Sequence, residues 1–446
     1  MKSALPKVLH PVAGQPMVEH VLRAAGTLSP TTVTLVVGHG ADFVRKQLGN
    51  SQKVAFALQE PQLGTAHALQ QAESFLANRE GTVVLLSGDV PLLSGSTLRN
   101  LVRTHQAAGA AATVLTAVVE RPYGYGRIVR QNGRIARIVE ERDASAEVRQ
   151  IREINSGVYA FDLPPLFDAL RGIASQNAQG EYYLTDLIGI YKRRKRPVET
   201  LLIDNAEEIR GVNSRTELAE VSKIVRQTKN EELMAAGVTI IDPSTTYIDQ
   251  DVEIGPDTVI HPGVVIEGQT KIGAACEIHG SVRIRDSEIA DKVMIQNFCL
   301  LIGARVAEGA SIGPFAHLRP ESVVGERAKV GNFVELKKTT MGPGSKANHL
   351  AYLGDATIGA NVNVGAGTIT CNYDGTHKHP TTIEDGAFIG SDSQLIAPVR
   401  IGKGAYVAAG SSITEDVPDG ALGIARGRQS NVEGWAERRK TAAAKT

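Results

Sequence analysis

The chain has 446 residues, of which 42% are hydrophobic and 22% charged, and its 48 basic residues balance its 48 acidic residues. This length exceeds what one hydrophobic core usually serves, so we expect two or three domains of ordinary globular composition. The balanced charge excludes a whole-chain field that attracts nucleic acid or anionic lipid, so any phosphate-binding site has to be local.

The cysteines and the apolar runs predict the compartment. Three cysteines without metal-ligand spacing are typical of reduced thiols in a cytosolic protein. The first residues have no apolar segment of the signal-peptide type, and no run reaches the ~18 apolar residues that a membrane-spanning helix needs. The sequence therefore predicts a cytoplasmic protein that neither binds nucleic acid nor inserts into a membrane.

Residues 1–213 alternate between helical and strand-like segments. Pro16 opens a segment with apolar residues at helical spacing, where proline favours a first turn. The segments 33–38 (VTLVVG) and 82–89 (TVVLLSGD) are typical of short buried strands. This alternation predicts an α/β, Rossmann-like domain with a doubly wound, mostly parallel sheet. Ligands of such sheets lie beyond the C-terminal strand ends, where Asp89 falls.

Residues 214–236 are predicted to form a helical linker arm, because 214–235 is rich in Glu, Lys, Leu and Ala and contains no Gly or Pro. Residues 429–446 form a C-terminal tail that we expect to be largely disordered.

Residues 237–428 repeat with a period of six. This period fits neither a helix nor a lone strand, but it fits a triangular solenoid whose flat strands each add one aliphatic residue to a central column. Three strands make a coil, and neighbouring coils stack about 4.8 Å apart. Two excursions are expected to interrupt the coils, one after residue 336 and one after residue 370. The predicted column consists of Ile248, Ile254, Ile260, Ile266, Ile272, Ile278, Ile284, Met294, Leu300, Val306, Ile312, Leu318, Val324, Val330, Leu336, Ile358, Val364, Thr370, Ile383, Ile389, Leu395, Ile401, Val407 and Ile413.

Motifs in both halves resemble known families. The second half resembles the hexapeptide-repeat transferases, which implies a left-handed parallel β-helix. The first half resembles the sugar-phosphate nucleotidyltransferases through LPKVLHPVAGQPMVEHVL, QLGTAHAL, LSGDVPLL, GYGRIV, IVEERDA, EINSGVY and GVNSR. Both halves in this order resemble the bifunctional enzymes that acetylate glucosamine-1-phosphate with acetyl-CoA and then couple N-acetylglucosamine-1-phosphate to UMP from UTP. That resemblance also implies a homotrimer.

The resemblance implies an acetyl-transfer site around residues 335–373. Attack of an amine on a thioester needs a base of near-neutral pKa, and His349 matches that base, with Glu335 orienting its imidazole. On the sequence alone, a solvated loop histidine is a more common interpretation of His349 than a general base. Lys337 and Lys338 could likewise be a solvated face. The further residues implied are Arg319 and Lys337 for the sugar phosphate, Tyr352 and Asn363 for the sugar, and Ala366, Asn372, Tyr373, Ser391, Ala409 and Arg426 for acetyl-CoA.

The resemblance also implies a uridyl-transfer site. Transfer of a uridylyl group depends on positioning and charge neutralisation, for which Mg²⁺ held by oxygen ligands is expected. Asp89 and Asn213 match the metal ligands, although Asp89 alone could also cap the turn that follows it. Ser87 stands where the family has an aromatic residue. The other nucleotide- and sugar-binding positions implied are Lys7, Gln59, Gly64, Thr65, Gly126, Glu140 and Asn155.

The N-terminus departs from the family pattern. The family begins with a strand and a Gly-rich loop ending Gly-Thr-Arg-Met, whereas here Met1 falls at that final Met and Leu5-Pro6-Lys7 follows. Either the start codon is assigned too late or the chain is truncated. For the chain as written, we expect two strands with unpaired edges and very weak uridyl transfer.

Two rival functions remain open on the sequence. One is an acetyltransferase with a degenerate nucleotidyltransferase domain, and the other is a non-catalytic sugar-nucleotide sensor or scaffold. Retention of Asp89 with Asn213 argues against the first, and the presence of His349 with Glu335 argues against the second.

Overall fold

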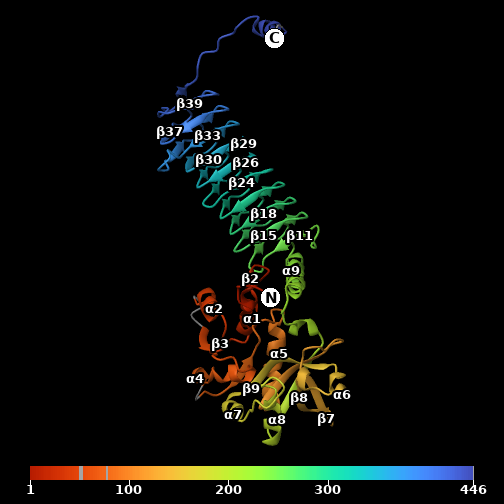
Figure 1. The fold of residues 1–446 in the computed structure, drawn as a ribbon. Helices are drawn as coiled ribbons and strands as arrows, with labels where there is room; N and C mark the ends of the chain where they lie inside the picture. The colour runs from red at the N-terminus through yellow and green to blue at the C-terminus, as the bar shows by residue number, and fades with distance from the viewer. Residues whose placement is uncertain (50–53, 77–78, 445–446) are drawn as a thin grey trace. The chain divides into compact units, whose positions relative to one another are not determined.

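The computed structural model describes residues 1–49, 54–76 and 79–444. The chain divides into two compact units, residues 1–225 and 226–446, coloured from red to green and from green to blue in Figure 1. Among the described residues, no helix is long and apolar enough to cross a membrane.

The first unit is an α/β unit in which helices and strands alternate. The expected strands at 33–38 and 82–89 appear as β3 and β5, and the helix after Pro16 appears as α1. Its helices are η1 (Lys7–Leu9), α1 (Met17–Gly26), α2 (Ala41–Leu48), α3 (Thr65–Gln70), α4 (Glu73–Leu76), α5 (Gly95–Ala107), η2 (Glu141–Asp143), α6 (Ala146–Arg149), α7 (Leu163–Leu170), α8 (Asp186–Arg193) and η3 (Ala206–Ile209). Its strands are β1 (Pro11–Val12), β2 (Gln15–Pro16), β3 (Val33–Val37), β4 (Val54–Leu58), β5 (Thr82–Leu85), β6 (Ala112–Val118), β7 (Arg127–Gln131), β8 (Arg134–Val139), β9 (Glu153–Asp162) and β10 (Val198–Ile203).

The expectation of a mostly parallel sheet is wrong for this unit. Strands β3 and β4 form a separate parallel pair, and the main sheet is mixed, because the long β9 runs antiparallel to β5, β6 and β7. Among the described residues, β3 pairs only with β4 and β5 only with β9. A cavity of about 950 Å³ lies against both of those strands.

The helix α9 (Arg215–Ala235) carries the chain from the first unit into the second. Its N-terminal half packs through Val221 and Val225 against Val12 and Met17 of the first unit. In its C-terminal half, the Arg226 guanidinium lies 3.9 Å from the centre of the Tyr247 ring.

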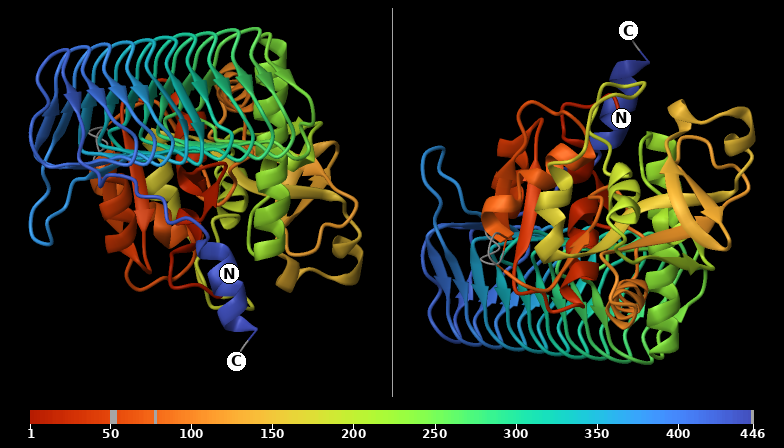
Figure 2. Two further views of the ribbon diagram at one scale, coloured as in Figure 1. Left: turned by 90° about the horizontal axis from the view of Figure 1, so that it is seen from above. Right: turned by 90° about the horizontal axis from the view of Figure 1, so that it is seen from below.

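The second unit is a parallel β-helix with three faces, whose stacked coils are visible in Figure 2. From β11 to β39, successive strands fall on successive faces, so each face contains every third strand, and β40 then returns to the first face. The first face is β11 (Thr239–Ile240), β14 (Val259–Ile260), β17 (Glu277–Ile278), β20 (Met294–Ile295), β23 (Ser311–Ile312), β26 (Lys329–Asn332), β29 (Lys346–His349), β32 (Asn363–Val364), β35 (Phe388–Ile389), β38 (Tyr406–Val407) and β40 (Leu422–Gly423). The second face is β12 (Tyr247–Ile248), β15 (Val265–Glu267), β18 (Arg283–Arg285), β21 (Leu300–Ile302), β24 (His317–Leu318), β27 (Glu335–Lys337), β30 (Tyr352–Gly354), β33 (Ile369–Cys371), β36 (Gln394–Ile396) and β39 (Ser412–Ile413). The third face is β13 (Glu253–Ile254), β16 (Lys271–Ile272), β19 (Glu288–Ile289), β22 (Arg305–Val306), β25 (Val323–Val324), β28 (Thr340–Met341), β31 (Ala356–Ile358), β34 (Thr381–Ile383) and β37 (Val399–Ile401).

The predicted aliphatic column forms the core of this unit, with two members misplaced. Met294 is 39% exposed and Leu300 is only partly buried, and their neighbours Ile295 and Leu301 occupy the core instead. The reason is a shortened coil: the step from Ile284 to its aligned partner Leu301 is a single residue shorter than the step from Ile260 to Ile278.

The first predicted excursion is also wrong. Residues 337–357 continue the coils without a break, because Met341, Ala347 and Leu353 fill the core at the positions that the six-residue count misses. The second excursion is confirmed as a loop between β33 and β34, closed by a bridge between Tyr373 and Lys378.

The C-terminal tail differs from the expectation of disorder, since Trp435–Ala443 forms the helix α10. No residue of α10 is buried, so the helix does not depend on packing against the β-helix.

Candidate active sites

A row of residues follows one edge of the β-helix, where the first face turns into the second. Each member comes two positions after the buried residue of a first-face strand, so successive coils place these residues side by side. Backbone bonds between coils fix the row; for example, Asp392 N donates to Ala366 O at 2.7 Å and Gly410 N to Ser391 O at 2.8 Å. This corner row consists of Asn332, His349, Ala366, Ser391 and Ala409. It therefore brings the predicted base and three predicted acetyl-CoA positions to one edge.

The polar neighbour of His349 is another member of the corner row. His349 Nδ1 lies 2.5 Å from Asn332 Oδ1, whereas the Glu335 carboxylate accepts a hydrogen bond from Arg319 Nη1 at 2.9 Å. The structure thus gives the imidazole a different partner from the one expected on the sequence. Sequence reasoning missed Asn332 as a partner of His349. Asn332 lies one shortened coil before His349, and that spacing could have predicted that the two residues are neighbours.

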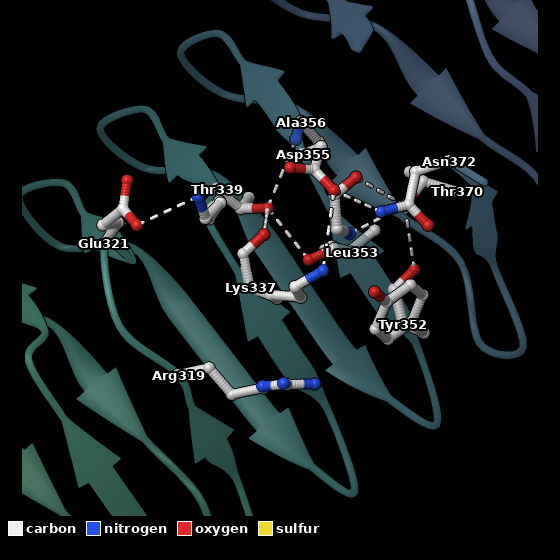
Figure 3. Close-up of polar contacts among 12 residues, drawn as sticks. Arg319, Glu321, Lys337, Thr339, Tyr352, Leu353, Asp355, Ala356, Thr370 and Asn372 are labelled. Carbon is white, nitrogen blue, oxygen red and sulfur yellow. Dashed lines mark hydrogen bonds and ion pairs between the residues drawn. The ribbon is translucent and has the colours of Figure 1, made fainter. Parts of the chain in front are cut away.

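Cationic side chains gather on the second face next to this edge. Glu335 and Lys337 both point outward from β27, because alternate residues of a strand share a face. Arg319 lies one coil before Lys337 and Tyr352 one coil after Glu335. Lys337 is largely buried, with Nζ 3.8 Å from Asp355 Oδ2 (Figure 3). Four predicted residues, Arg319, Glu335, Lys337 and Tyr352, therefore share one surface.

A glycine permits the close packing at the end of this surface. A Cβ on Gly354 would lie 2.5 Å from Tyr352 Oη and 2.8 Å from Asn372 Nδ2. Asn372 donates to Asp355 Oδ2, so the carboxylate that faces Lys337 is held from both sides. Any larger residue than glycine would displace the Tyr352 ring or the Asn372 amide.

The loop after β33 adds a cation that sequence reasoning missed. Contact with the Lys337 ammonium lowers the pKa of Lys378. Two neighbouring ammonium groups attract an anion. The interruption of the repeat after residue 370 is the sequence feature that could have pointed to Lys378. Tyr373 of the same loop is 60% exposed, as a residue of a binding surface would be.

The remaining acetyl-site positions are spread around the same edge. Arg426 Nη1 donates to Ala409 O of the corner row at 2.8 Å. Asn363 instead lies on the first face, where β32 aligns it with Lys346. Asn363 is therefore on a different face from Arg319, Lys337 and Tyr352.

In the first unit, Lys7 joins the two predicted metal ligands. Its Nζ lies 2.5 Å from Asp89 Oδ2 and 2.7 Å from Asn213 Oδ1. A backbone bond from Val212 N to Asp89 O at 3.0 Å holds the two segments together. An ammonium group thus already occupies the point between a carboxylate oxygen and an amide oxygen, which is the donor set that hard divalent cations prefer.

A pocket of about 330 Å³ opens beside this trio. Its lining includes Asp89 and Asn213 together with Tyr125, Arg210 and Glu217. Burial raises the pKa of the Tyr125 hydroxyl. Sequence reasoning missed Tyr125 and Arg210, because neither stands out in composition or spacing.

The other nucleotide- and sugar-binding candidates surround the larger cavity. Lys7, Thr65, Glu140 and Asn155 line it. A Cβ on Gly126 would lie 3.5 Å from both Asn155 Cβ and Glu140 Oε1, so that glycine belongs to the same cluster.

The candidate glycine Gly64 lies outside that lining, where it shapes the loop before α3. Its φ of 109° suits glycine, and a Cβ there would meet Tyr182 O at 2.7 Å. Gln59 Nε2 donates to Gly64 O at 3.0 Å, so Gln59 supports this loop.

The environment of Glu140 gives a testable pH dependence. Burial raises the pKa of Glu140, so the unfolded chain loses this proton at lower pH than the folded chain does. The free energy of unfolding of the parent therefore falls as pH rises through that window. Glutamine does not titrate, so the Tm of Glu140→Gln relative to that of the parent should rise between pH 4 and pH 8. Thermal unfolding followed by circular dichroism at both pH values measures this gain. An equal Tm difference at both pH values would contradict the assignment, and the exposed Glu199→Gln serves as the matched control.

Two sequence profiles match the chain. The nucleotidyl transferase profile covers residues 2–206, and the bacterial transferase hexapeptide profile covers residues 251–286 and 380–415. These ranges fall in the first unit and in the β-helix respectively.

Curated relatives match across nearly the whole chain. The "Bifunctional protein GlmU" of Trichlorobacter lovleyi is 52% identical over 98% of this chain and 95% of its own length. Proteins of the same name from Pelobacter propionicus and Shouchella clausii are 49% and 50% identical, over 99% and 98% of this chain and 96% of their own lengths.

The two units and the full-length similarity agree. The nucleotidyl transferase match lies in the first unit, the hexapeptide matches lie in the β-helix, and the relatives match both units together. The chain belongs to the bifunctional GlmU family and is an enzyme of UDP-N-acetylglucosamine synthesis that carries out acetyl transfer and uridyl transfer.

Proposed function

We propose that acetyl transfer takes place at the corner row, with His349 as general base. The observation that supports this most strongly is the alignment of His349 with Ala366, Ser391 and Ala409 on consecutive coils. Nδ1–H of His349 donates to Asn332 Oδ1, which leaves Nε2 free to accept a proton. Nε2 takes the proton of glucosamine-1-phosphate as the amine nitrogen attacks the thioester carbon, and the proton then passes to the departing CoA sulfur.

The second face binds the sugar phosphate in this proposal. Arg319 and Lys337 neutralise the phosphate, and Tyr352 contacts the sugar ring. Arg319 is engaged by Glu335 and Lys337 by Asp355, so the phosphate competes with carboxylates for both cations. Asn363 reaches the sugar from the first face. Acetyl-CoA lies along Ala366, Ser391 and Ala409, with Asn372 and Tyr373 at one side and Arg426 paired with a cofactor phosphate.

The uridyl-transfer site lies around Asp89, Asn213 and Lys7. Mg²⁺ bound to the Asp89 and Asn213 oxygens would neutralise the phosphate oxygens of UTP. A metal ion held by these two oxygens would take the position of the Lys7 ammonium, which would leave Lys7 available to bind a phosphate. Gln59, Gly64, Thr65, Gly126, Glu140 and Asn155 position uracil, ribose and the acetamido sugar.

The division of labour follows the domains predicted from the sequence. Residues 1–213 carry uridyl transfer, 214–236 form the linker arm, 237–428 carry acetyl transfer and 429–446 form the tail. Separate assays of the two half-reactions test this division: a chain that lacks acetyl transfer, or that binds sugar nucleotide without turnover, would contradict it.

A homotrimer is proposed from an exposed aromatic surface. Phe298, Phe315 and Phe333 stack on consecutive coils with ring centres 5.0 and 5.1 Å apart, and they are 55%, 45% and 55% exposed. We refer to these three stacked rings as the aromatic ladder. Leu350, beside His349, follows Phe333 by one shortened coil and is 62% exposed. Apolar patches of this kind mark protein interfaces, and this one adjoins the corner row.

Phe315→Asp should dissociate the trimer. A charge in the centre of the aromatic ladder is expected to cost at least ~2 kcal/mol at each subunit contact. Sedimentation velocity of the full chain measures the change from trimer to monomer, and acetyl transfer should fall with it. Phe43→Asp, which changes an exposed phenylalanine of α2, is the control and should stay trimeric. A trimeric Phe315→Asp variant would exclude this surface.

A further inference from the structure

Two histidines and a glutamate converge on the first face of the β-helix, at a place that neither reaction uses. Glu277 Oε1 lies 3.3 Å from His261 Nε2 and 3.4 Å from His279 Nε2. The ligand atoms of the three residues all lie within 4.8 Å of one another. We refer to His261, Glu277 and His279 as the His–Glu cluster.

The regular geometry of the β-helix creates this cluster. Glu277 and His279 are two residues apart on β17 and its extension, so both point outward. His261 precedes His279 by one full coil, and the two imidazole rings stack with centres 4.7 Å apart and planes inclined by 7°. Backbone bonds from His261 N to Ile278 O and from His279 N to Ile295 O, at 2.9 and 2.8 Å, hold both positions. The backbone from which these side chains project is therefore held in place by hydrogen bonds between coils.

The polar atoms of the cluster are incompletely satisfied. His279 Nε2 is buried from solvent and has no hydrogen-bond partner among the described residues, although it faces the Glu277 carboxylate. A buried ring nitrogen without a partner destabilises the folded state, and a ligand that binds to that nitrogen removes this cost. Two stacked imidazolium rings would repel each other, whereas coordination of one cation needs both rings neutral.

The distances suit a transition-metal ion. A cation 2.0–2.2 Å from each of its ligands in a tetrahedral arrangement places those ligand atoms roughly 3.4 Å apart. The two nitrogen-to-oxygen distances of the cluster, 3.3 and 3.4 Å, already have this value. Two imidazoles with one carboxylate favour Zn²⁺ and its neighbours over Mg²⁺ or Ca²⁺, which prefer oxygen ligands alone.

We infer that the His–Glu cluster binds one Zn²⁺-type divalent cation through His261 Nε2, His279 Nε2 and a Glu277 carboxylate oxygen, with water completing the coordination. The three side chains are 28–43% exposed, so a cation can enter from solvent. Because His261 and His279 belong to different coils, the cation cross-links two coils of the β-helix. The cluster lies four strands from β29 on the same face, roughly 19 Å at about 4.8 Å per strand, so it is separate from His349.

Calorimetric titration of the full chain, first freed of metal with a chelator, tests the inference with ZnCl₂ as the probe. We expect about one equivalent of Zn²⁺ bound per chain and a rise in Tm with added Zn²⁺, since a ligand of the folded state stabilises it. Co²⁺ in place of Zn²⁺ should give a visible absorption band of a low-coordinate site. His261→Gln and His279→Gln should each weaken Zn²⁺ binding at least tenfold, with circular dichroism spectra like that of the parent.

His377→Gln is the matched control, because His377 is a solvent-exposed histidine of the same unit outside the cluster, and its Zn²⁺ binding should equal that of the parent. Unchanged binding in both cluster variants would overturn the inference, since the metal would then bind elsewhere. Absence of Zn²⁺ binding by the parent chain would overturn it as well. If the glutamine variants fold poorly, Glu277→Gln provides the same comparison without removing an imidazole.

Discussion

Replacing His349 by alanine should reduce kcat of acetyl transfer by about 10²–10⁴-fold, the usual contribution of a general base. The imidazole lies at the surface of the corner row and contacts Asn332 rather than the core, so its loss should leave Tm nearly unchanged. Steady-state kinetics with glucosamine-1-phosphate and acetyl-CoA measure the reduction. KM should change little, because the sugar phosphate is bound by the second face.

The partner of the imidazole supplies a second comparison. Asn332→Ala removes the acceptor of Nδ1–H, so both tautomers become populated and only part of the enzyme keeps Nε2 free. We therefore expect a loss in kcat smaller than that of His349→Ala. Uridyl transfer, measured on the same preparations, should be equal to that of the parent in both variants. A His349→Ala variant with near-parental acetyl transfer would exclude His349 as the base, whatever Asn332→Ala does.

Replacing Asp89 by asparagine should reduce uridyl transfer by about 10²–10³-fold relative to the parent, because the site loses the charge that holds a divalent cation against phosphate repulsion. The variant keeps the size of the side chain and can still meet Lys7. Half-saturation should require a higher Mg²⁺ concentration, which a metal titration of the initial rate measures. Acetyl transfer should not change.

The matched control for Asp89 is Asp168→Asn. Asp168 pairs with Arg194 at 2.6 Å on the exposed surface of the same unit, so it tests the effect of losing one carboxylate away from the site. Exposed ion pairs contribute about 1 kcal/mol or less, and both activities should persist. If Asp89→Asn showed parental uridyl transfer with an unchanged Mg²⁺ requirement, the assignment of Asp89 as a metal ligand would fail.

The sequence alone determined the two-part fold, the solenoid and most of the aliphatic column. These follow from local rules: strand residues alternate in direction, and a six-residue period turns one side chain inward on each face. The resemblance then assigned candidate residues to each reaction. The sequence did not determine which of these residues contact one another, because those contacts depend on which coils and strands become neighbours.

The tertiary structure decided which residues meet. Coils shortened by a single residue shift the core by one position, which places Ile295 in the core where Met294 was expected and brings Asn332 beside His349. Lys7 meets Asn213 across 206 positions of sequence, and no local pattern encodes such a contact. Backbone geometry within a few residues sets the period of a repeat. Which residues become neighbours on adjacent coils depends on the exact number of residues in every coil, and contacts such as that of Lys7 with Asn213 depend on segments far apart in the sequence. The set of residues in each site is therefore determined only by the folded molecule.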